Sequence, residues 1–224
     1  MRRLRVGRWD GWTVLAVVLF TSPTISLTAQ QFSVGPELVF GDYRETSADL
    51  RYHGGGIGAK AAMQWKKFSA DLALWKIKYK PDGGVVATGF DASEVNVRLR
   101  YYIAGPISAE LGFMNRKADP EFEAQSMGAL TAGAYMSHPL GPGVRVALDG
   151  GLMLGPKFSG GGSVSGLGAV RLGLGLTVDA LHGRLLVTGD YDFQSVSRET
   201  DNGNGALPAP IQQSLGRIGL AIAF

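Results

Sequence analysis

Residues 93–103, SEVNVRLRYYI, contain the pattern that decides the fold. The odd-numbered positions from Val95 to Ile103 are apolar, whereas the even-numbered positions from Glu94 to Arg100 carry polar or charged side chains. A β-strand directs successive side chains to opposite faces of its sheet. The segment therefore predicts a strand with one apolar and one polar face.

The same alternation recurs along most of the chain. It is regular in residues 32–40, 57–65, 107–113, 144–154, 170–179, 185–193 and 218–224, and less regular in 71–80 and 127–136. In residues 71–80 the pattern assigns Tyr79 to the apolar face and leaves Leu72 and Leu74 on the polar face. Together these segments predict an all-β domain of about ten strands, with about eight as the neighbouring possibility.

The predicted connections alternate in length. Tight-turn residues occur at 66–67, 105–106, 141–143 and 182–183, whereas longer polar or glycine-rich connections cover 42–51, 81–92, 115–125, 155–166 and 195–211. This order predicts an antiparallel up-and-down arrangement in which both ends of the domain lie on the short-turn side. We find no internal repeat and no sign of a second domain within residues 30–224.

Residues 1–29 have the organisation of a secretory signal peptide. Four arginines between Arg2 and Arg8 precede an apolar core at 12–20, and small and polar residues follow up to a cleavage site near Ala29. The apolar core is too short for a membrane-spanning helix, which takes about 20 residues. The formal net charge of +3 belongs to this segment, so the remaining domain is neutral and we expect no nucleic-acid partner.

Alternation is also compatible with a soluble barrel whose apolar face is inside. Three features favour a barrel with its apolar face toward lipid: glycines on the polar face, the two classes of connection, and aromatic residues near the strand ends. We expect these aromatic residues to form two interfacial girdles: Phe32, Trp65, Tyr101 and Phe224 near the short turns, and Phe40, Tyr79, Phe113 and Phe193 near the longer connections. A sheet that spans a membrane must close, which predicts a closed antiparallel transmembrane β-barrel.

With these features the domain resembles the small bacterial outer-membrane β-barrels of the outer-membrane protein A/X type. The final segment, SLGRIGLAIAF, is similar to the β-signal of such barrels, with Arg217, Gly219, Ile222 and Phe224 at its motif positions. The resemblance implies a location in the outer membrane, with outer-membrane lipid as surroundings and the barrel assembly machinery as a partner during biogenesis. We expect a monomer, and the resemblance identifies no activity.

An apolar face toward lipid places the charged residues of the strands in the lumen. These are Glu37, Lys60, Glu94, Arg98, Arg100, Glu110, Arg145, Asp149, Arg171, Asp179, Asp190, Asp192 and Arg217. Because unpaired buried charges are costly, we interpret them as a neutralising network. The alternative is a narrow polar pore, for which the lumen glycines would leave room.

Enzyme and cofactor chemistry have little support in the sequence. Asp190 and Asp192 form a pair of carboxylates on one face that is suited to acid–base work. There is no cysteine and no spacing typical of a metal or phosphate site, so we predict no cofactor. The sequence predicts a structural or surface-interaction role through long extracellular loops. A narrow porin-like channel for small polar solutes is the first alternative, and an outer-membrane enzyme acting on lipid or peptide is the second.

Overall fold

The computed structural model describes residues 31–47, 49–82, 87–119, 122–181, 183–201 and 205–224. The predicted signal peptide and its cleavage site lie outside the described residues. The elements are β1 (Gln31–Glu45), β2 (Leu50–Trp65), β3 (Phe68–Pro81), β4 (Phe90–Ala104), β5 (Ile107–Asp119), the 3-10 helix η1 (Glu123–Gln125), β6 (Met127–Gly141), β7 (Val144–Phe158), β8 (Ser163–Ala180), β9 (Leu185–Asp201), β10 (Ala206–Pro208) and β11 (Ile211–Ala223).

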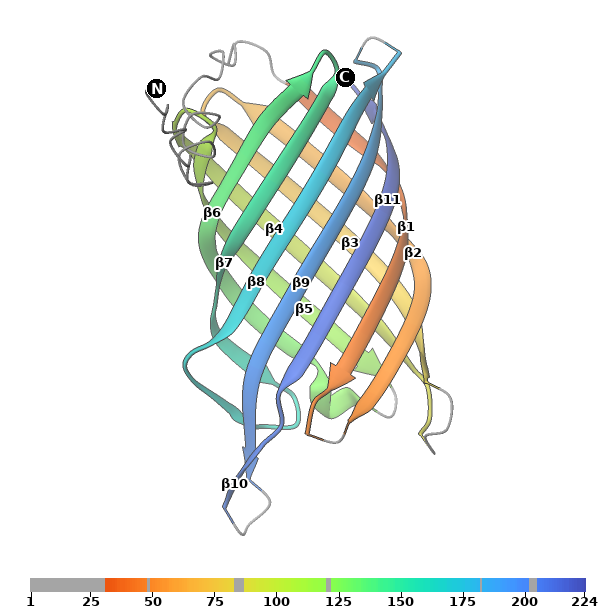
Figure 1. Ribbon diagram of the computed structural model, residues 1–224, viewed down its shortest axis with the longest axis vertical. Helices are drawn as coiled ribbons and strands as arrows, with labels where there is room; N and C mark the ends of the chain where they lie inside the picture. Colours follow the sequence, from red (N-terminus) through yellow and green to blue (C-terminus); the bar gives the residue numbers. More distant parts are fainter. Residues whose placement is uncertain (1–30, 48, 83–86, 120–121, 182, 202–204) are drawn as a thin grey trace, which may run out of the picture.

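The strands form one closed antiparallel barrel (Figure 1). From β1 to β9 each strand pairs with the next along the chain, and β9 also pairs with β11. β1 closes the ring on β11 in a register that sets Leu38 opposite Ile218. The short strand β10 only extends the edge of β9, which leaves ten long strands in the wall. The predicted closed up-and-down barrel of ten strands is confirmed, and the eight-stranded alternative is wrong. Among the described residues, no helix is long and apolar enough to cross a membrane.

The outside of the barrel is apolar and its inside is charged. Leu38, Ile57 and Leu111 on the outer face are 56%, 69% and 64% exposed, whereas Glu110 and Arg171 in the lumen are buried. This polarity would be unstable in water but suits hydrocarbon, where a closed sheet leaves no backbone edge unpaired. The molecule is a transmembrane β-barrel, and barrels of this type reside in the bacterial outer membrane.

The two ends of the barrel differ in their connections. At one end, the short-turn rim, strands are joined at 66–67, 105–106, 142–143 and 181–184. At the other end, the long-connection rim, they are joined at 46–49, 82–89, 120–126, 159–162 and 202–210. The connections predicted at 42–51, 155–166 and 195–211 are too long, because paired strands continue into these segments. The barrel therefore presents the ends of extended hairpins where long loops were predicted (Figure 1).

The predicted face assignment of β3 is wrong. Leu72 and Leu74 are exposed on the outer face, while Trp75 and Tyr79 are buried in the lumen, so Tyr79 is not part of an outer aromatic girdle. The reason is that the polarity of both the lumen and the outer surroundings of β3 changes beyond Leu74. The lumen becomes apolar there, and the outer face leaves the apolar band and carries Lys76 and Lys78.

Candidate functional site: a filled lumen

The lumen is the part of the molecule that could bind or conduct a solute, and it contains three zones. A charged layer crosses the middle of the barrel and consists of Asp71, Arg98, Arg100, Glu110, Asp149, Arg171, Asp192 and Arg217. An apolar core fills the half toward the long-connection rim. A vestibule opens from the short-turn rim and ends at the charged layer.

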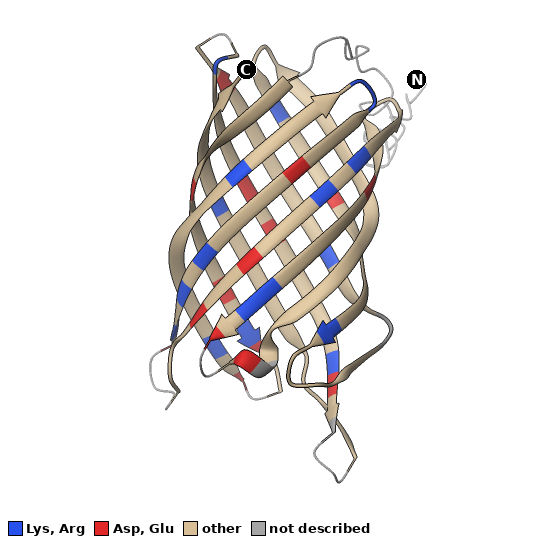
Figure 2. Cartoon of the chain, turned by 180° about the vertical axis from the view of Figure 1, so that it is seen from behind, with Lys and Arg blue, Asp and Glu red and all other residues tan. Residues whose placement is uncertain are grey.

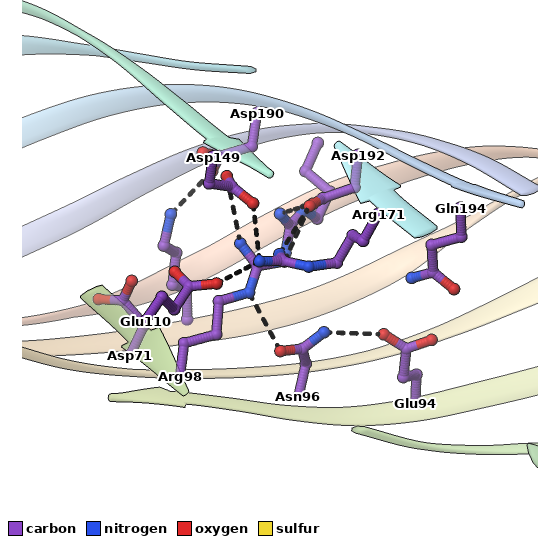
Figure 3. A network of polar contacts seen from close by, with 12 residues as sticks. Asp71, Glu94, Asn96, Arg98, Glu110, Asp149, Arg171, Asp190, Asp192 and Gln194 are labelled. Carbon is purple, nitrogen blue, oxygen red and sulfur yellow. Dashed lines mark hydrogen bonds and ion pairs between the residues drawn. The ribbon is translucent and has the colours of Figure 1, made fainter. Parts of the chain in front are cut away.

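Asp192 of β9 is the centre of the charged layer (Figure 3). Its Oδ1 lies 2.8 Å from Nη2 of Arg98 and 3.6 Å from Nη1 of Arg171, and its Oδ2 pairs with Arg217. Arg98 comes from β4, on the opposite side of the ring from β9. A single buried carboxylate therefore connects its own strand, β9, to three other strands of the wall, β4, β8 and β11.

Arg171 of β8 is the most deeply buried cation, at 1% exposure. Its guanidinium pairs with Glu110 of β5 and lies 2.8 Å from Oδ1 of Asp149 on β7. Arg98 also approaches Asp149, at 3.7 Å. Buried charges of this kind need several partners to offset their desolvation. Six members of the layer have two or more ionic partners, whereas Asp71 and Arg217 have one each.

Arg100 of β4 extends the layer toward β3. Its Nε donates a 2.7 Å hydrogen bond to Oε2 of Glu110, its Nη1 pairs with Asp71, and its guanidinium stacks 3.8 Å from the centre of the Tyr135 ring. Asp71 was not among the predicted lumen charges, because the faces of β3 were predicted in reverse. The leucines at 72 and 74, which interrupt the supposed polar face, are the signal that could have identified it.

A second polar cluster lies beside the charged layer. Glu94 of β4 accepts hydrogen bonds of 3.1 and 3.0 Å from Arg116 of β5, and Arg116 also donates to Gln194 of β9. Asn96 joins the two clusters by donating to Glu94 and accepting from Nε of Arg98 at 3.2 Å. Arg116 was not among the predicted lumen charges, because residues 115–125 were predicted as a connection.

The lumen glycines make room for this network. A Cβ built on Gly173 would lie 2.2 Å from Oδ2 of Asp149, and one on Gly112 would lie 2.5 Å from Oγ1 of Thr131. The space beside these glycines is thus occupied by neighbouring side chains. It does not provide the open path that the pore alternative requires.

Beyond the polar clusters, aromatic rings close the lumen. The ring of Phe90 lies 4.8 Å from that of Tyr79, 5.4 Å from that of Tyr43 and 4.4 Å from that of Phe122, measured between centroids. Tyr52 packs edge-on against Phe90 and Phe122. These close, tilted or stacked contacts are typical of a solid core, and they lie between the charged layer and the long-connection rim.

The vestibule at the opposite end has a volume of about 270 Å³. Within the vestibule, Nζ of Lys60 on β2 lies 2.8 Å from Oδ2 of Asp190 on β9. Glu37 lines its wall, is 4% exposed, and has no hydrogen-bond partner for either carboxylate oxygen among the described residues. Arg145 is exposed at the mouth and forms no ion pair with any residue that the structure describes.

The structure thus brings most of the predicted lumen charges together. Besides Glu37 and Arg145, Asp179 does not join the network. It is exposed and accepts a hydrogen bond from the backbone N–H of Gly183 in the β8–β9 turn, because β8 has already reached the rim at this position.

The remaining predicted aromatic residues lie on the outer face. Phe32, Phe40, Trp65, Tyr101, Phe113 and Phe224 are exposed, and Phe193 is half-buried. The ring of Phe224 lies 6.1 Å from that of Phe32 at the seam between β11 and β1. Phe68, which was not among the predicted girdle residues, packs between Trp65 and Tyr101 at the short-turn rim.

An exposed histidine–carboxylate pair on the outer wall was also missed. Nδ1 of His53 on β2 lies 2.6 Å from Oδ1 of Asp82, just beyond the end of β3. The two residues are far apart in sequence, and only the antiparallel register of β2 and β3 brings them together.

The sequence matches no protein-family model and no curated protein. Among solved structures, the chain is similar to Neisserial surface protein A, with 10% identity and a TM-score of 0.45 over 86% of this chain and 97% of that one. It is also similar to the translocator domain of the autotransporter NalP from Neisseria meningitidis, with 11% identity and a TM-score of 0.43 over 95% and 93% of the two chains.

A third similar structure is the outer membrane protease OmpT from Escherichia coli, with 8% identity and a TM-score of 0.37 over 91% of this chain and 99% of that one. The three names describe a surface protein, a translocator and a protease, so the likeness concerns the fold alone. On its own geometry, the chain is a ten-stranded transmembrane barrel of the outer-membrane type with a filled lumen.

Proposed function

We propose that the protein is a closed, non-conducting outer-membrane barrel that serves as a rigid scaffold for interactions at its long-connection rim. The observation that carries this proposal is the pair of barriers across the lumen. The charged layer joins opposite walls through Arg98 and Asp192, and the aromatic core around Phe90 follows it. Outer-membrane lipid and the barrel assembly machinery remain the partners that we propose for the monomeric barrel.

A solute entering from the vestibule would first have to break the charged layer. Removing one partner from a buried ion pair costs about 3–5 kcal/mol, because it leaves an uncompensated charge. The solute would then enter an apolar core that offers no hydration to an ion. Small barrels filled by their own side chains behave as packed cores, and this lumen is filled in the same way.

The long-connection rim is held together by hydrogen bonds between separate hairpins. Arg198 of β9 pairs with Gln125 of η1 and donates a 2.7 Å hydrogen bond to the carbonyl of Gly161. Gln125 in turn donates to Oε1 of Glu45, at the end of β1, at 2.9 Å. A surface fixed in this way loses little conformational entropy when a partner binds, which supports an interaction role.

The alternatives have weaker support. A narrow channel for polar solutes would require both barriers to move. Acid–base catalysis by Asp190 and Asp192 would require carboxylates free to exchange a proton, whereas Asp190 is engaged by Lys60 and Asp192 by three arginines.

Planar-bilayer recording tests the proposal. Folded, heat-modifiable protein should insert without discrete current steps, while a porin added to the same bilayers provides the positive control. Reproducible unit steps from the purified barrel would overturn the closed-lumen model. For the rim, Arg198→Ala should leave the barrel folded. When protease is added to intact cells, this variant should be cleaved faster than the wild type at the hairpin ends of the long-connection rim. Arg145→Ala, which changes an exposed residue at the other end of the barrel, should not be cleaved faster.

A further inference from the structure

A polar groove lies on the outer wall between β3 and β7, near the long-connection rim. It has a volume of about 540 Å³, and its lining includes Lys76, Ser93, Asn115, Lys117, Gly128 and Lys157. We call it the lysine groove. It lies outside the lumen, on the wall that the proposed outer-membrane lipid would surround. Figure 2 shows the basic and acidic positions along the barrel.

The lysine groove begins where the apolar outer band ends. On β3, β4 and β5 the last outward apolar residues are Leu74, Val95 and Phe113, and the next outward residues are Lys76, Ser93 and Asn115. The boundary continues from Leu154 to Lys157 on β7. Because the band matches the hydrocarbon layer, the groove lies at the depth of the lipid headgroups.

Strand register brings donors together in this groove. Ser93 pairs with Lys76 on one side and with Lys117 on the other, which places the two lysine backbones about 10 Å apart across three strands. On the next strands, Gly128 lies between Asn115 and Lys157. A Cβ on Gly128 would meet nothing closer than 3.9 Å, so the absence of a side chain leaves a hollow between these two donors.

Apart from the buried Arg116, the groove lining carries three lysines and three carboxylates, and only one ion pair forms among these described residues. Lys76 pairs with Asp91 at 3.1 Å. Lys117 and Lys157 form no ion pair within the described part of the chain. Asp119 and Glu123 also line the groove. Asp119 lies opposite Asp91 in the strand register, and this pair is the next outward-facing one beyond Ser93 and Lys117, farther from the apolar band. The side nearest the band therefore has two free ammonium groups beside hydroxyl and amide donors.

From this arrangement we infer that the lysine groove binds the phosphorylated headgroup of a membrane lipid. Lysine is a point-charge phosphate binder, and an ammonium group near a membrane surface strengthens the binding of an anionic lipid roughly five-fold. The acyl chains of the same lipid would lie on Val95, Phe113 and Leu154 directly below. A free phosphate ion would gain nothing from that apolar surface, which is why the proposal commits to a lipid.

Native mass spectrometry of the folded barrel tests this inference, with diphosphoryl lipid A as the probe and EDTA present to remove bridging cations. We expect the wild type to retain the lipid, and Lys117→Gln/Lys157→Gln to weaken its binding roughly twenty-fold. Lys117→Arg/Lys157→Arg should restore most of the binding. The matched control Lys66→Gln/Lys67→Gln, at the short-turn rim, should bind like the wild type.

Three results would overturn the inference. These are unchanged binding by the groove variant, equal loss in the matched control, and displacement of the lipid by inorganic phosphate at the same concentration. Heat-modifiable migration of each variant confirms that the barrel is folded before binding is compared. Because the measurement does not involve the lumen, its failure would leave the closed-barrel proposal standing.

Discussion

Arg98 and Asp192 meet across the full width of the barrel, with Nη2 of the arginine 2.8 Å from Oδ1 of the aspartate. Their strands, β4 and β9, occupy opposite positions in the ten-membered ring. The contact therefore connects opposite walls of the barrel, and it restricts their movement relative to each other.

Removing one partner of the Glu94–Arg116 pair should destabilise the barrel more than removing both. Arg116→Met leaves the buried Glu94 carboxylate uncompensated and should lower the free energy of unfolding by about 3–5 kcal/mol. The double variant Glu94→Leu/Arg116→Met should recover most of that loss, because apolar replacements of a buried pair are often neutral. Urea unfolding in lipid vesicles measures both values, and additive losses in the double variant would contradict the prediction.

Two buried carboxylates in the lumen should respond differently to loss of charge. Asp192→Asn removes the counter-charge of three arginines and should cost about 3–5 kcal/mol of unfolding free energy. Glu37→Gln removes a buried charge that has no hydrogen-bond partner among the described residues, so it should leave the free energy of unfolding unchanged or raise it. The same vesicle assay compares the two variants, and equal effects would show that hydrogen-bond pairing does not determine the cost.

Adjacent glycines on β2 should differ sharply in their tolerance of a methyl group. A Cβ on Gly56 would lie 1.8 Å from the carbonyl oxygen of Lys76, whereas one on Gly55 meets nothing closer than 3.9 Å. Gly56→Ala should destabilise the barrel by about 1–3 kcal/mol or prevent its folding. Gly55→Ala should stay within about 0.5 kcal/mol of the wild type. Heat-modifiable migration in gels reports folding, and a folded, fully stable Gly56→Ala barrel would refute the close approach.

Substitutions in the aromatic pair of Phe32 and Phe224 can distinguish a role of Phe224 in assembly from a role in packing. The backbone N–H of Phe224 donates a 2.8 Å hydrogen bond to the carbonyl of Phe32, and the centroids of the two rings lie 6.1 Å apart with their planes tilted by 32°. Phe224→Ala should reduce the amount of barrel in the outer membrane more than it reduces folding into detergent micelles. Phe32→Ala removes the same ring pair but leaves the proposed assembly signal intact, so its outer-membrane level should be close to the wild type. Equal levels of the two variants would argue against a signal at Phe224.

Alternation was sufficient to predict the architecture, because a residue's position in a strand decides its face regardless of distant contacts. Segments such as 93–103 therefore identified a lipid-facing and a lumen-facing side, and most of the predicted charges are in the lumen. The same rule failed in β3, where Trp75 and Tyr79 belong to an apolar lumen and Lys76 to an outer surface beyond the band. Hydropathy alone cannot distinguish the two faces when both environments change along one strand.

The sequence by itself determined a closed membrane barrel and the approximate composition of its interior. Only the tertiary structure decided that this interior is filled. The partners of Asp192 come from β4, β8 and β11, and those of Phe90 from β1, β3 and the segment around Phe122. Such contacts depend on ring closure and strand stagger, which bring together residues that are remote along the chain. The lysine groove has the same origin, because the register of five neighbouring strands places Lys76, Lys117 and Lys157 around one hollow.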